Sequence, residues 1–110
     1  MSLFERDYIK RLIQQLARFV ALIGRARDER KLDVALRLSE DAHREVLGVP
    51  HEMLSRLDVR SAALLLGPGK IALYAELLRL EADLRRELGQ IEDGDAAEHR
   101  AVALERQIDG

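Results

Sequence analysis

The fold class is decided by residues 4–23, FERDYIKRLIQQLARFVALI, in which apolar side chains recur every three or four positions. This spacing places them along one side of an α-helix. The main apolar stripe consists of Ile9, Leu12, Ile13, Leu16, Val20 and Ile23. Four further apolar residues widen it: Phe4, Tyr8, Phe19 and Leu22. An apolar face this wide usually contacts more than one neighbour, so we expect a long helix within a bundle. Gly24 and the charged run over residues 25–31 are expected to mark its end or a loose last turn.

The same helical spacing continues toward the C-terminus. The further helices that it predicts span residues 32–47, 50–57, 59–66, 68–89 and 97–108. Gly48 is expected to end one helix, Asp58 and Pro68 to begin others, and Asp93-Gly94-Asp95 to turn the chain, with Asp95 capping the last helix. No segment alternates with a period of two. The sequence therefore predicts an all-α fold, a small bundle of antiparallel helix pairs with five or six helices.

The composition fits one globular domain over residues 1–110, because 47% of the residues are hydrophobic and 35% are charged. The absence of cysteine excludes disulfides, a thiolate nucleophile and a cysteine-ligated zinc site. Charges occur within the first seven residues, and no apolar run approaches the length of a membrane span. We therefore predict a cytoplasmic protein that does not enter the membrane.

Charge is distributed unevenly along the chain. Residues 1–31 hold eight Lys and Arg against four Asp and Glu, a balance of +4, whereas the remainder holds ten against sixteen, a balance of −6. The basic residues on the first helix are Arg6, Lys10, Arg11, Arg18, Arg25 and Arg27. They offer a surface for an acidic or nucleic-acid partner. Interleaved acidic residues and the scarcity of aromatic residues argue against nucleic acid.

Histidines and carboxylates supply the only candidate metal ligands. Glu40 and His43 have the Glu-x-x-His spacing of di-iron bundles, but a second copy of the motif is missing. Asp95 and His99 lie one helical turn apart and share a face. We interpret these four as surface residues and predict no metal site and no cofactor.

Catalytic motifs are also missing from the sequence. The chain has no triad-like spacing of Ser and His and no glycine-rich cofactor loop. Gly67-Pro68-Gly69-Lys70 lacks the other residues of a phosphate loop. We predict that the protein is not an enzyme and has no catalytic residues.

The opening FERDYIKRLI at residues 4–13, followed by Leu16, resembles the start of a family of uncharacterised bacterial proteins. That family begins roughly F-x-x-D-Y-I-x-R-x-I-x-x-L, and the match covers about the first 20 to 25 residues. The family is a domain of unknown function. The resemblance implies a bacterial origin and helical structure, and nothing more specific.

A second resemblance concerns the positions of small residues. Ile23-Gly24, Ala35, Ala42 and Pro50 resemble the second half of a tetratricopeptide repeat, where small residues let paired helices approach. The resemblance implies a repeat-like helix pair that binds another protein. The chain is too short for the three repeats that a regular array needs.

These observations favour a non-enzymatic protein-interaction or self-association module, with a homodimer as the expected state. The predicted interface consists of Phe4, Tyr8, Leu12, Leu16 and Phe19 on the first helix and Leu77, Leu80 and Leu84 on the helix over 68–89. Two alternatives stay open. One is a metal- or small-molecule-binding bundle, and the other is an adaptor that binds an acidic or nucleic-acid partner through the first helix.

Overall fold

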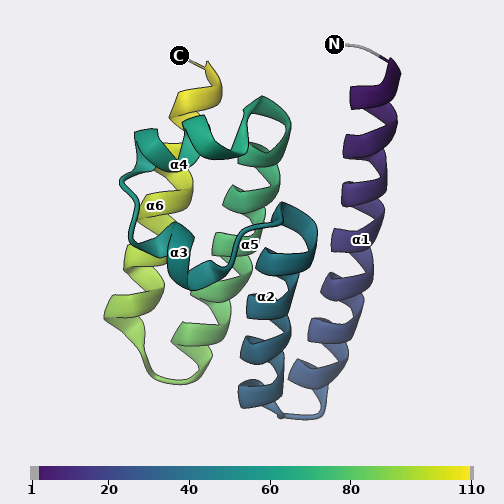
Figure 1. The fold of residues 1–110 in the computed structure, drawn as a ribbon. Coiled ribbons are helices and arrows are strands. Elements are labelled where there is room, and N and C mark those ends of the chain that lie inside the picture. Colours follow the sequence, from purple (N-terminus) through teal and green to yellow (C-terminus); the bar gives the residue numbers. More distant parts are fainter. Residues whose placement is uncertain (1–2, 110) are drawn as a thin grey trace.

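The computed structural model describes residues 3–109 and contains six helices, with no strand among those residues (Figure 1). The helices are α1 (Leu3–Asp28), α2 (Leu32–Leu47), α3 (His51–Ser55), α4 (Val59–Leu66), α5 (Pro68–Glu87) and α6 (Ile91–Asp109). This confirms the predicted all-α bundle.

Two antiparallel helix hairpins form the bundle. The first joins α1 to α2 and the second joins α5 to α6, and α2 packs on α5 to unite them (Figure 1). The short helices α3 and α4 connect the hairpins, and α4 lies against α5 and α6. Large side chains that are fully buried come from both hairpins and from α3: Ile23, Leu47, Leu54, Tyr74, Leu77, Leu84 and Leu104. The core therefore extends across the α2–α5 junction.

Several helix ends lie where local chemistry predicts them. Gly48 follows α2 with a φ of 76°, a left-handed conformation that glycine adopts without strain. The carboxylate of Asp58 accepts a hydrogen bond of 2.8 Å from the backbone N–H of Ser61 and so caps α4. Pro68 begins α5, where its missing N–H leaves no helical hydrogen bond unmade.

The first helix ends within the range predicted for it, whereas a predicted turn is wrong. The first helix ends at Asp28, inside the charged run over residues 25–31, because Ile23 and Ala26 are buried against neighbouring helices and hold the last turns in place. The expected turn at residues 93–95 lies inside α6, and the chain turns instead around Gly89, whose φ is 83°.

Gly94 has a packing role rather than a turning role. A β-carbon at this position would lie 2.9 Å from the backbone carbonyl oxygen of Ala82 and 2.8 Å from the side chain of Arg86. The missing side chain lets α6 approach α5 closely. Asp95 does not cap a helix, because it lies inside α6, where its carboxylate accepts a hydrogen bond of 2.8 Å from Arg86.

Candidate functional site

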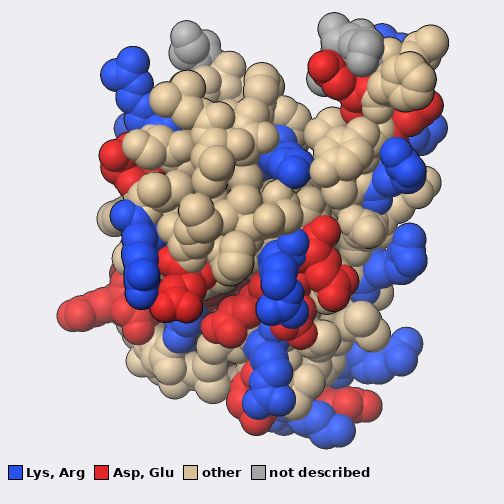
Figure 2. Space-filling model, in the orientation of Figure 1, with Lys and Arg blue, Asp and Glu red and all other residues tan. Residues whose placement is uncertain are grey.

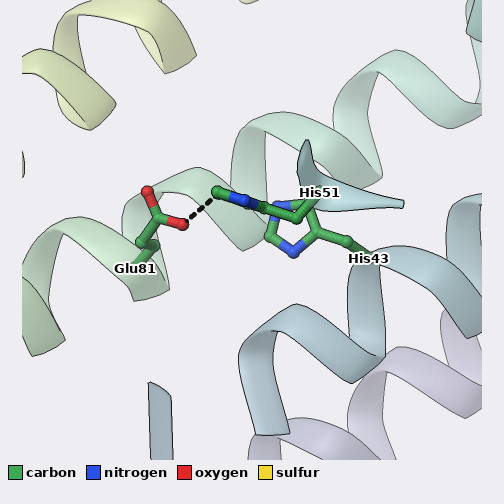
Figure 3. Close-up of side chains that lie close together, drawn as sticks. All are labelled: His43, His51 and Glu81. Atoms are coloured by element: carbon green, nitrogen blue, oxygen red, sulfur yellow. Dashed lines mark ion pairs between the residues drawn. The ribbon is translucent and has the colours of Figure 1, made fainter. Parts of the chain in front are cut away.

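Two imidazoles and a carboxylate meet in the interior where α2, α3 and α5 come together (Figure 3). His43 lies on α2, His51 is the first residue of α3, and Glu81 lies in α5. The two rings meet edge to face, with centroids 4.8 Å apart. One nitrogen of each ring and one carboxylate oxygen all lie within 4.8 Å of one another.

His43 is fully buried, and one of its nitrogens has no partner. Its Nδ1 lies 2.7 Å from the backbone carbonyl oxygen of Ser39. Because a carbonyl oxygen only accepts, Nδ1 carries the proton and Nε2 holds a lone pair. No hydrogen-bond donor reaches that Nε2 from residues 3–109. Burial lowers the pKa of His43 to about 4, although the Ser39 hydrogen bond acts the other way, so the ring is neutral at neutral pH.

His51 and Glu81 form a partly buried ion pair, with Nε2 of the ring 2.5 Å from a carboxylate oxygen. The hydrogen bond to Glu81 raises the pKa of His51, and burial opposes this effect more weakly. Burial alone would raise the pKa of Glu81, but the hydrogen bond and charge of His51 together outweigh it, so the pKa of the carboxyl is lowered. The pair therefore favours its charged form.

A cavity of about 320 Å³ lies beside this pair. Besides His51 and Glu81, its walls include Ser55, Tyr74, Arg85 and Arg100. Arg100 donates one hydrogen bond of 2.9 Å to the Tyr74 hydroxyl and another of 2.6 Å to the carbonyl of Leu54. These bonds tie α6 to α5 and α3, and they fix one wall of the cavity.

The four sequence-derived ligand candidates do not come together. Glu40 and His99 are exposed, and Asp95 is bonded to Arg86. Helix α5 lies between α2 and α6, so these residues are on different sides of the bundle (Figure 1). Only His43 belongs to the cluster, and its interpretation as a surface residue is wrong because its side chain is buried.

Glu81 is not among the site residues predicted from the sequence, although the sequence holds a signal for it. Glu81 follows Leu77 by four positions and precedes Leu84 by three, and both leucines are fully buried. A carboxylate on the core side of a leucine stripe needs a partner, because an isolated buried charge is costly. That partner is His51, which no spacing rule connects to it.

Half of the predicted interface belongs to the core of the chain. Four of its leucines are buried by the neighbouring helices, and for these the prediction is wrong: Leu12, Leu16, Leu77 and Leu84. Phe19 and Leu80 are half-buried against the same core. Phe4 and Tyr8 are exposed, and Phe4 retains 89% of its accessible surface.

Six of the thirteen large apolar residues that are exposed between residues 3 and 109 lie at one end of the bundle, where α1 begins, α4 lies and α6 ends (Figure 1). We call this the end surface; it comprises Leu3, Phe4, Tyr8, Leu64, Leu65 and Ile108. In Figure 2, residues other than Lys, Arg, Asp and Glu fill the upper middle of the view, with charged residues around the start of α1 and at the upper left edge, and further charged residues gather lower down.

Two adjoining hollows mark the end surface. One, of about 220 Å³, lies between Tyr8 and Pro68, and the other, of about 380 Å³, lies between Leu64, Pro68 and Ile108. Gly67 and Pro68 line both. We call these two adjoining hollows, one on the side of α1 and the other on the side of α6, the groove of the end surface.

The basic residues of α1 form no compact site. Arg27 donates a hydrogen bond of 2.7 Å to Glu87 on α5 and so joins the two hairpins. Lys and Arg lie along the outer edge of α1 in Figure 2, with acidic residues near both ends of the helix. Binding of an acidic partner here stays a prediction.

No known protein family, curated protein or solved structure matches this chain. The two resemblances of the sequence therefore stay predictions. None of the helices between residues 3 and 109 combines the length and apolar character required to cross a membrane.

Proposed function

We propose that the chain is a non-enzymatic self-association module in which two copies meet through the end surface. The observation that carries this proposal is the exposure of large apolar side chains at one end, above all Phe4 at 89% and Leu64 at 78%. Contiguous exposed apolar patches on small proteins usually mark contact sites.

The start of α1 has the form of an arm. Its first buried residue is Leu12, so the first two turns carry Phe4 and Tyr8 without burying either in the core. The groove of the end surface lies beside this arm. An arm and a groove at the same end are self-complementary, because a two-fold axis lets each arm cover the groove of the other copy.

The expected affinity follows from the area that such contacts remove from water. Fully burying a Phe or Leu side chain contributes about 1.5–3 kcal/mol, so Phe4 and Leu64 of both copies contribute about 6–12 kcal/mol. The loss of translational and rotational freedom costs about 4–15 kcal/mol. The two ranges overlap, and their most favourable combination leaves about 8 kcal/mol, which corresponds to a dissociation constant of about 1 µM. We therefore expect a weak dimer, with a dissociation constant of about 1 µM or higher, rather than an obligate one.

Light scattering coupled to size exclusion tests the proposal over about 1 µM to about 500 µM. The wild type is expected to reach twice the 12.5 kDa of one chain as concentration rises. Phe4→Asp and Leu64→Asp are expected to stay monomeric, since both side chains lie outside the core. Ile91→Asp is the matched control, because Ile91 is 53% exposed at the opposite end of the bundle.

Two outcomes would contradict the proposal. A mass of 12.5 kDa at every concentration excludes self-association and leaves the end surface for a different protein. A dimer that persists in both end-surface variants, or that Ile91→Asp abolishes, places the interface elsewhere.

A further inference from the structure

The His43–His51–Glu81 cluster is independent of the end surface, and its chemistry is that of a metal site. Two imidazole nitrogens and one carboxylate oxygen form a donor set used by zinc and by neighbouring divalent transition metals. We propose that these three side chains bind a divalent transition metal ion of the zinc class, with His43 coordinating through Nε2.

The orientation of His43 supports this assignment. Metal-bound histidines almost always donate their second ring N–H to a carbonyl or carboxylate, which fixes the ring and its tautomer. His43 does this with the carbonyl of Ser39, at 2.7 Å. The opposite nitrogen, Nε2, is buried and lacks a hydrogen-bond partner within residues 3–109. A fully buried lone pair without a donor is rare in proteins, and a metal ion would satisfy it.

The geometry requires only a small adjustment. Zinc bonds to nitrogen and oxygen measure about 2.0–2.2 Å, which places ligand atoms of a tetrahedral site about 3.3 Å apart. The candidate ligand atoms lie within 4.8 Å of one another, and the closest pair, on His51 and Glu81, is 2.5 Å apart. A metal between them would widen this pair and bring the more distant ligand atoms closer together by at most about 1.5 Å.

The surroundings of the cluster give a metal ion access to its ligands and leave one of its coordination positions open. His51 and Glu81 line the cavity of about 320 Å³, so an ion can reach them from that side. Three protein ligands leave the fourth position of a tetrahedral ion open to water. Mg²⁺ prefers an octahedral shell of oxygen ligands, so two imidazoles select against it.

Equilibrium dialysis of the EDTA-treated full chain against Zn²⁺ tests the proposal. The wild type is expected to retain about one ion per chain, and Mg²⁺ in excess should not displace it. We expect Glu81→Gln and His43→Asn to weaken Zn²⁺ binding at least about tenfold. His99→Asn, which removes an exposed histidine, is the control and should bind as the wild type does. Phe4→Asp should also bind normally, which separates this test from that of the dimer.

An NMR titration of the wild type covers the case in which a variant does not fold. The chain has three histidines, and Zn²⁺ should shift the ring signals of His43 and His51 but not those of His99. Failure to retain Zn²⁺, equal affinity in His43→Asn, or shifts confined to His99 would each overturn the proposal.

Discussion

Acidification of the metal-free protein from pH 6.5 to about pH 4 is expected to lower its free energy of unfolding by about 3 kcal/mol. Burial lowers the pKa of His43 from 6.5 to about 4. Between these two values the unfolded chain binds a proton that the folded chain does not bind. Stability therefore falls as the pH falls through this interval.

The other titratable groups around His43 change the free energy of unfolding mainly outside the interval from pH 6.5 to pH 4. The hydrogen bond to Glu81 raises the pKa of His51 above 6.5 in the folded chain. The contribution of His51 to the free energy of unfolding is therefore fully present below pH 6.5, and it is lost only as the pH rises through this raised pKa. His51 lowers the pKa of Glu81 below 4.5 despite the opposing effect of burial, so that contribution is lost only at still lower pH. Burial raises the pKa of Tyr74 above 10. The interval from pH 6.5 to pH 4.5 thus reports on His43.

Urea unfolding followed by circular dichroism, with EDTA present, measures this dependence. His43→Asn is the informative variant, because the Asn amide can still donate to the Ser39 carbonyl but does not titrate. Its unfolding free energy should be nearly constant between pH 6.5 and pH 4.5. His99→Asn should keep the slope of the wild type, about 1.4 kcal/mol per pH unit at most. Equal slopes in wild type and His43→Asn would show that another group is responsible.

Gly94→Ala is expected to destabilise the protein by about 2 kcal/mol, even though alanine is the better helix former. The gain in helix propensity is about 1 kcal/mol. Against it, the new β-carbon would lie 2.9 Å from the Ala82 carbonyl oxygen, which belongs to the backbone and cannot turn aside. Separating two packed helices to relieve such an overlap costs about 3 kcal/mol, the upper end of the usual range.

Gly24→Ala is the matched control for this substitution. Gly24 also lies inside a helix, α1, but a β-carbon there would meet nothing within 4 Å. This variant is expected to stabilise the protein by about 1 kcal/mol, because only the propensity changes. Urea midpoints of the two variants should therefore move in opposite directions. Shifts of the same sign would refute the close approach of α6 to α5 at Gly94.

The helices could be predicted from the sequence because their signals are local. Gly48, Asp58 and Pro68 act through the backbone of their own helix ends, so their neighbours along the chain suffice to interpret them. Gly94 could not be interpreted in this way. A glycine between two aspartates is typical of a turn, and only the position of Ala82 on the opposite helix shows that it serves packing instead.

The interface and the buried cluster could be predicted only in part, for a related reason. Periodicity shows that Leu16 and Leu77 lie on apolar faces, but whether the same chain or a second one covers those faces depends on tertiary packing. His43 drew notice through its spacing to Glu40, whereas its real neighbours come from α3 and α5. Contacts between separate elements leave no periodic pattern in a sequence.

The pairing of sequence neighbours in the two hairpins also bears on how quickly the chain folds. Helix α1 packs against α2, and α5 packs against α6, across turns of only a few residues. The α2–α5 junction is the main contact between helices that are separated by a longer stretch of chain. Closing short loops costs little entropy, and helical proteins with such local contacts fold in microseconds to milliseconds. Each hairpin can form independently of the other. We therefore expect the docking of α2 on α5 to limit the folding rate.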